Sequence, residues 1–205
     1  MIAPSWVFAS TPKARHACAQ GYSYGGYASR DGVRGVSASV AAERPPTVAS
    51  GHTAAWVGVG GTHEARGGAS AWLQAGVAAF PHTGLRLYVE EVSLGDSRRF
   101  VDLGPAQVGR SYVVSVVETV HEVWQASIDG RQVGRPAYLP TGGGAWRGVV
   151  TAESWAGGRA ACNSYGYRFE RPAVLGRAWQ PLTPAQALGE GVTRSAGGSG
   201  FAARS

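Results

Sequence analysis

Ten short β-like runs, separated by glycine, proline or aspartate, dominate the sequence between residues 22 and 174. Short strands punctuated by turn residues are typical of antiparallel sheets. The 31 glycines and 11 prolines among 205 residues suit that many turns. The pattern predicts an all-β protein, a two-sheet antiparallel β-sandwich over residues 21–182. The expected strands are Tyr22–Ser29, Val33–Ala42, Ala54–Gly60, Ala71–Phe80, Leu85–Ser93, Ser111–Thr119, Val123–Ile128, Val133–Leu139, Arg147–Trp155 and Tyr165–Val174.

The two ends of the chain are expected to lie outside the sandwich. Residues 1–20 read as an N-terminal extension without the basic region of a signal peptide. Residues 183–205 read as a short helix over Pro184–Leu188 followed by a disordered tail that is small and polar. Inside the sandwich, Asp129-Gly130 predicts a two-residue hairpin turn, because both positions tolerate positive φ.

The net charge of +6 is not accompanied by a nucleic-acid-binding pattern. Every basic side chain except Lys13 is an arginine, and these arginines are scattered singly or, at Arg98-Arg99, as one pair. Dispersed charge is normally a solvated face, whereas a nucleic-acid partner favours a basic run or a recognisable motif. No stretch reaches the roughly 18 consecutive apolar residues of a membrane-spanning helix. We therefore expect no nucleic-acid partner and no membrane insertion.

The histidines and cysteines do not form a metal-binding pattern. His121-Glu122 begins like a zinc-protease motif, but Gln125 stands where the second histidine is needed. The five histidines are most simply surface residues or hydrogen-bonded ones. Cys18 and Cys162 could form one disulfide or remain buried thiols, because pairing depends on a distance that the sequence does not give. No metal and no cofactor is expected.

Three expected strands combine a tryptophan and small or polar residues on one face with aliphatic residues on the other. This follows because alternate residues of a strand point to opposite sides of a sheet. Such an arrangement is what a binding face over an aliphatic core would show. The residues concerned are Trp56 with Gly58 and Gly60, Trp72 with Gln74, and Trp155 with Glu153.

The same strands carry a family resemblance that covers roughly residues 22–174. In order and spacing the chain resembles the eqolisin-type glutamic peptidases, which have a WVGIDG-like strand, a strand with a catalytic Gln and an AEW-like strand with a catalytic Glu. The chain departs from the family at three places: Gly60 replaces an acidic residue, Tyr88-Val89-Glu90 stands where the family has an aromatic-rich W-Y-E segment, and Ser154 separates Glu153 from Trp155. The matching segments are Tyr24–Ala28, Ser37–Val40, Ala55–Gly61, Trp72–Val77 and Val150–Trp155.

The resemblance implies a concanavalin-like jelly roll and a metal-free, acid-acting endopeptidase. Glu153 would be the general base and acid, and Gln74 would donate a hydrogen bond to the oxyanion. We expect these two side chains on adjacent strands, close enough to share one water. The resemblance also implies a secreted protein that binds a protein or peptide substrate, and we expect it to be a monomer. The residues expected to line the substrate cleft are Trp56, Trp72, Tyr88, Glu90 and Trp155.

Two alternatives stay open. Gln74 and Glu153 could be ordinary polar residues on a solvated sheet face, since one fold often hosts unrelated functions. The chain could also be a non-catalytic binding module for a carbohydrate or a protein, using its seven tryptophans and eight tyrosines as a stacking surface. A calcium-dependent lectin is not favoured, because the sequence lacks a cluster of Asp and Asn ligands.

Overall fold

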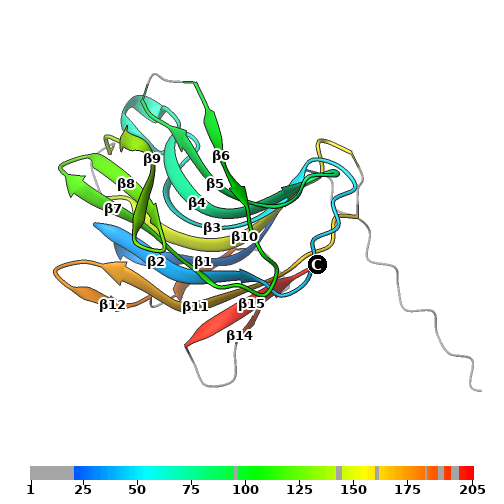
Figure 1. Cartoon of the computed structure of the whole chain (residues 1–205). Coiled ribbons are helices and arrows are strands. Elements are labelled where there is room, and N and C mark those ends of the chain that lie inside the picture. The colour runs from blue at the N-terminus through cyan, green and yellow to red at the C-terminus, as the bar shows by residue number, and fades with distance from the viewer. Residues whose placement is uncertain are drawn as a thin grey trace, which may run out of the picture.

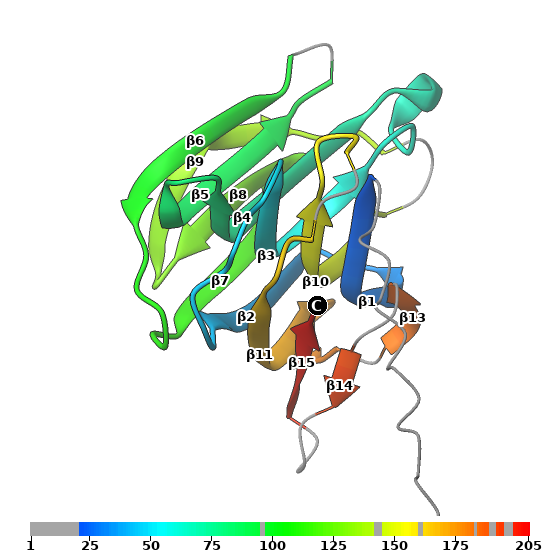
Figure 2. The same ribbon diagram turned by 90° about the vertical axis from the view of Figure 1, so that its right-hand side faces the viewer.

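The computed structural model describes residues 21–94, 97–141, 145–159, 162–182, 184–188, 192–194 and 199–205. These residues form β-strands and one 3₁₀ turn, η1 (Arg66–Gly68). The strands lie in two antiparallel sheets that pack against each other, as Figures 1 and 2 show. The expected two-sheet antiparallel β-sandwich is therefore confirmed.

The first sheet has seven strands. Its neighbours are paired antiparallel throughout. Figure 1 shows that its central strands curve strongly, with the hollow side facing away from the second sheet. In spatial order the strands are β13 (Pro184–Leu188), β1 (Tyr22–Gly32), β10 (Arg147–Trp155), β3 (His52–Gly61), β4 (Ala71–Phe80), β5 (Gly84–Val92) and β6 (Arg99–Pro105).

The second sheet has eight strands. One of them, β12 (Trp179–Pro181), pairs only with β11 and lies off the main path. The others are, in spatial order, β14 (Val192–Arg194), β15 (Gly200–Arg204), β11 (Gly166–Leu175), β2 (Gly35–Ala42), β7 (Tyr112–Val120), β8 (Val123–Ile128) and β9 (Arg131–Tyr138).

The core lies between the sheets and follows the alternation of each strand. On β3 and β4 the inward residues are aliphatic and almost fully buried, as at Val57 and Leu73. The second sheet contributes valines and rings such as Phe169. Removing this apolar surface from water stabilises the fold by about 25 cal/mol per Å². The outward face of the first sheet does not pack against the second sheet, so its side chains can line a binding or catalytic site.

The expected hairpin at Asp129-Gly130 is confirmed. Both residues have positive φ, 51° and 75°, and Ile128 pairs with Arg131 across the turn between β8 and β9. Within residues 21–182, the strands β6 and β12 were not predicted. The residues of β6, RFVDLGP, are mostly exposed. This edge strand therefore lacks the continuous apolar face by which a strand is recognised in a sequence.

The expected helix at Pro184–Leu188 and the expected disordered tail are wrong where the structure describes them. Pro184–Leu188 forms β13, which pairs with β1 at the edge of the first sheet, where a proline is tolerated. Within the tail, β14 and β15 pair with each other, and β15 continues the second sheet beside β11. Phe201 is buried against Tyr27 and Phe169, so long-range packing overrides the weak local pattern.

The sequence left open whether the two cysteines form a disulfide or remain thiols. Cys162 is disulfide-bonded, so it is not a buried thiol, while residues 1–20, including Cys18, lie outside the described residues. Among the described residues, no helix is long and apolar enough to cross a membrane.

Candidate active site

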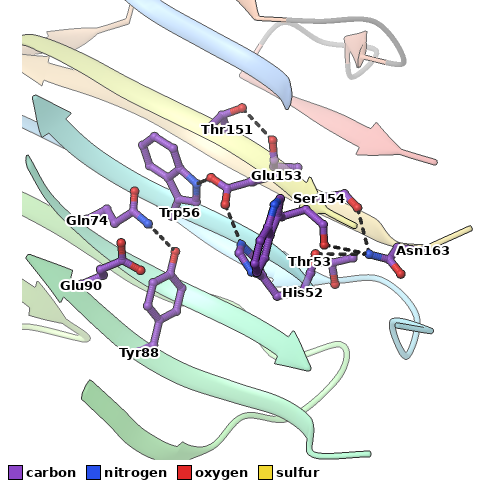
Figure 3. A network of polar contacts seen from close by, with 12 residues as sticks. His52, Thr53, Trp56, Gln74, Tyr88, Glu90, Thr151, Glu153, Ser154 and Asn163 are labelled. Atoms are coloured by element: carbon purple, nitrogen blue, oxygen red, sulfur yellow. Dashed lines mark hydrogen bonds and ion pairs between the residues drawn. The ribbon is translucent and has the colours of Figure 1, made fainter. Parts of the chain in front are cut away.

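Side chains from β3, β4 and β10 meet on the outward face of the first sheet. Gln74 on β4 lies opposite Gly58 of β3, and Glu153 on β10 lies opposite Ala54 of the same strand. Trp56 stands between these two positions on β3 (Figure 3). All three side chains line one cavity of about 410 Å³.

Glu153 is a buried carboxylate with a hydrogen-bond donor on each oxygen. His52 Nε2 lies 2.7 Å from Oε1, and Trp56 Nε1 donates to Oε2 at 3.1 Å (Figure 3). The residue is only 6% exposed. Burying an unpaired carboxylate costs free energy, and the hydrogen bonds from these two donors offset that cost. They also fix the direction in which the carboxylate faces the cavity.

Gln74 is held by the phenol of Tyr88. Its Nε2 donates to the Tyr88 hydroxyl at 3.3 Å. Burial, followed by the negative charges of Glu153 and Glu90, raises the pKa of Tyr88 well above its usual value, so the phenol is neutral at acid and neutral pH. An amide nitrogen has two N–H donors, and this bond uses one of them.

A second carboxylate, Glu90 on β5, lies near Gln74 and is paired with an arginine. Trp72 Nε1 donates to Glu90 Oε1 at 3.1 Å, and Arg98 contacts both carboxylate oxygens at 2.8 and 2.9 Å. The hydrogen bond to Glu90 raises the pKa of Arg98. This fork-like pairing neutralises Glu90 at the edge of the cavity.

Two tyrosines of β1, Tyr22 and Tyr24, line the opposite side of the same cavity. Their rings stack on each other, and Tyr22 also stacks on Trp155 with centroids 5.8 Å apart. Burial first, and then the negative charge of Glu153, raises the pKa of both phenols. The cavity is therefore walled by neutral rings on the β1 side and by the Glu90–Arg98 pair on the other.

The seven residues singled out from the sequence lie on one face of the sheet, and each lines one or both of two adjoining cavities. Trp56 and Trp72 line the first cavity, Tyr88 and Trp155 line the second, and Gln74 and Glu90 line both. One expectation is wrong: Gln74 and Glu153 are not on adjacent strands, because β3 lies between β4 and β10. Alternation predicts the face of a side chain, whereas the order of strands depends on long-range pairing.

His52 and Arg98 were not expected at the site. His52 shares its face with Trp56 because the two are four residues apart in β3, but the predicted strand began at Ala54 and so excluded it. Extending the alternation by one more pair would have found it. Arg98 lies in the connection before β6, and no periodic signal points to a residue in a loop.

The glycine that replaces an acidic residue has a local cause. Gly60 has φ of +89°, and a Cβ at this position would lie 2.2 Å from the carbonyl oxygen of Ala71. No side chain fits there without a backbone shift.

Among the described residues, no group of three or more His, Cys, Asp and Glu side chains is placed to hold a metal ion.

No protein-family model and no curated protein matches the sequence, whereas solved structures match the fold. Two crystal structures of scytalidoglutamic peptidase, each with a transition-state analogue, align with TM-scores of 0.59 and 0.61 at 16% and 15% identity. Each alignment covers 89% of this chain and 98% of the peptidase. SCP-B, an eqolisin-family peptidase in complex with the tripeptide Ala-Ile-His, aligns with a TM-score of 0.55 at 15% identity, over 91% of this chain and 98% of its own. This chain therefore has the β-sandwich fold of the eqolisin-type glutamic peptidases.

Proposed function

We propose that the chain is a glutamic endopeptidase that hydrolyses peptide bonds with Glu153, Gln74 and one water. The observation that carries the proposal is the placement of Glu153 and Gln74. A buried carboxylate with two fixed donors and an amide with an uncommitted N–H line one cavity, on the sheet face that the fold leaves open.

The reaction needs one base, one acid and one oxyanion donor. Glu153 takes a proton from the water as the water oxygen attacks the carbonyl carbon, and the carbonyl electrons move onto its oxygen. Gln74 donates an N–H to that oxyanion, a contribution typically worth about 3–4 kcal/mol. When the oxyanion collapses, the C–N bond breaks and Glu153 returns its proton to the leaving amine.

The proposal includes an acid working range and an exported location. A carboxyl group exchanges protons in the acid range, where it can serve as base and then as acid. The disulfide at Cys162 is in keeping with an oxidising compartment, where such bonds persist. The mechanism uses no metal or cofactor, and its substrate is a protein or peptide lying extended across the sheet.

The test is cleavage of a denatured protein from pH 2 to 7 by the wild type and by Glu153→Gln and Gln74→Ala. We expect acid-range activity that Glu153→Gln lowers by about 10²–10⁴-fold. Gln74→Ala should lower kcat by about 10²–10³-fold. Matched changes on the second sheet, Glu170→Gln and Gln132→Ala, should leave activity at the wild-type level. Circular dichroism checks that every variant is folded.

Two outcomes would contradict the proposal. Activity that survives in folded Glu153→Gln would place the chemistry elsewhere. A folded wild type that cleaves nothing would favour the binding module instead, for which the exposed rings of Tyr22 and Tyr24, stacked beside the half-buried Trp155, offer a surface for sugar rings. Glycan binding would then be measured with Tyr22→Ala as the comparison.

A further inference from the structure

A second cavity of about 280 Å³ adjoins the cavity that holds Glu153. The two cavities share Gln74, Glu90 and Arg98 as lining residues. Because Gln74 lines both, whatever occupies the second cavity lies next to the proposed oxyanion donor. None of the steps proposed for Glu153, Gln74 and the water requires this second cavity.

Its walls are an unbroken series of five rings from five neighbouring strands. Successive ring centroids lie 5.6, 5.8, 5.4 and 5.2 Å apart, distances typical of packed aromatic pairs. The rings belong, in this order, to Trp155 on β10, His52 on β3, Phe80 on β4, Phe100 on β6 and Tyr88 on β5.

Two alanines line the cavity between these rings. Ala54 and Ala78 are direct cross-strand partners on β3 and β4, and both are buried. With Tyr88 they form an apolar cluster that is separate from the core between the sheets. Because both alanines line the cavity, a larger side chain at either position would take up part of its space.

The charges at the cavity suit a neutral occupant. An aromatic cage with an unpaired carboxylate would attract a cation. Here the carboxylate, Glu90, is already paired with Arg98, and the arginine itself lines the cavity. The remaining lining groups are apolar or aromatic apart from the Gln74 amide and the His52 ring.

We propose that this cavity is a specificity pocket that receives one large apolar side chain of the peptide substrate, with aromatic side chains preferred. The inference rests on the proposed peptidase function and names the substrate class for it. His52 links the pocket to the chemistry, because its ring forms part of the wall while its Nε2 contacts Glu153. The residue held in the pocket therefore lies beside the bond that is cut.

The test uses peptides of one sequence that differ only by Phe, Leu, Ala or Lys at a single position, with cleavage sites read by mass spectrometry. We expect the wild type to cut beside Phe at least about tenfold faster than beside Ala in kcat/KM, as burial of a large apolar group predicts. Lys should be cut no faster than Ala.

Two variants probe the pocket itself. Ala78→Leu fills the cavity and should lower kcat/KM for the Phe peptide by about tenfold or more, while the Ala peptide changes less than threefold. Phe100→Ala removes a half-exposed wall and should reduce the ratio of Phe to Ala cleavage without preventing folding. Trp179→Ala, which removes an exposed ring on the second sheet, is the control and should leave that ratio unchanged.

The two proposals fail in different ways. If the wild type cuts through Glu153 but treats Phe, Ala and Lys alike, or if Ala78→Leu and Phe100→Ala slow every peptide equally, the pocket is overturned and the dyad stands. A preference for Lys would also overturn it. If the wild type cuts no peptide, the peptidase proposal fails and the pocket inference fails with it.

Discussion

At the scale of single residues, His52 contacts Glu153 directly, and it is a side chain of the site that the sequence did not predict. Its Nε2 lies 2.7 Å from Glu153 Oε1, and both side chains are buried. In the proposed mechanism the carboxylate binds a water and then returns a proton, and a fixed orientation would help both steps. Trp56 Nε1 donates to one oxygen and His52 Nε2 contacts the other, so in the proposed mechanism His52 would act as a positioning residue.

We therefore predict that His52→Ala lowers kcat by about 10–100-fold, with a smaller change in KM, because the base is misdirected in the transition state more than the substrate is lost. His52→Gln, which retains an N–H donor, should recover part of that loss. The same change at an exposed histidine, His121→Ala, should have no effect. Equal activity of His52→Ala and the wild type would show that the contact does not position Glu153.

At the scale of strands, the sequence predicted best what depends on alternation. Val57 and Leu73 point inward and Trp56 and Gln74 outward, as a period of two requires. What depends on pairing between distant segments was not predictable. That β3 separates Gln74 from Glu153, and that Pro184–Leu188 joins β1 as a strand, are decided by partners far away in the chain.

An ion-pair cluster links the first sheet to the second at one edge of the sandwich. Glu91 of β5 is 2% exposed, and its Oε1 contacts Arg99 of β6 and Arg135 of β9. The strand β9 is the last of the second sheet, so one carboxylate ties it to two strands of the first sheet. The two arginine side chains are 44% and 52% exposed, so water can solvate their charges, and removing the Glu91 charge weakens hydrogen bonds between charged donors and a buried acceptor.

Glu91→Gln should accordingly lower the free energy of unfolding by about 1–3 kcal/mol, measured by urea denaturation. The matched change Glu43→Gln removes the Arg204–Glu43 pair, in which the carboxylate side chain is 28% exposed against 3% for Glu91, and should cost less than about 1 kcal/mol. If both variants unfold at the same urea concentration as the wild type, Glu91 does not join the sheets energetically.

At the scale of the whole molecule, buried phenols couple stability to alkaline pH. Tyr167 lies in the core, and Tyr88 lies under the outward face, each almost fully buried. Burial raises the pKa of both, and for Tyr88 the negative charges of Glu153 and Glu90 add to the effect. In the unfolded chain a tyrosine ionises near pH 10.

The sign of the effect follows from proton counts. Below about pH 10 the folded and unfolded chains both hold these phenol protons, so stability does not change on their account. Above it the unfolded chain releases protons that the folded chain keeps, and stability falls as pH rises. The slope is at most about 1.4 kcal/mol per pH unit for each tyrosine.

We predict that the free energy of unfolding, measured by urea denaturation between pH 8 and 11, is level up to about pH 10 and then declines. Tyr167→Phe removes one of the contributing phenols and should make the decline shallower. At pH 8 the same variant should lose about 1 kcal/mol, because the Tyr167 hydroxyl no longer bonds Thr53 Oγ1 at 3.0 Å. The exposed Tyr138→Phe should keep the wild-type slope. A decline equally steep in Tyr167→Phe and the wild type would mean that the core opens to water before the phenol ionises, and that the sandwich is less rigid around Tyr167 than its burial indicates.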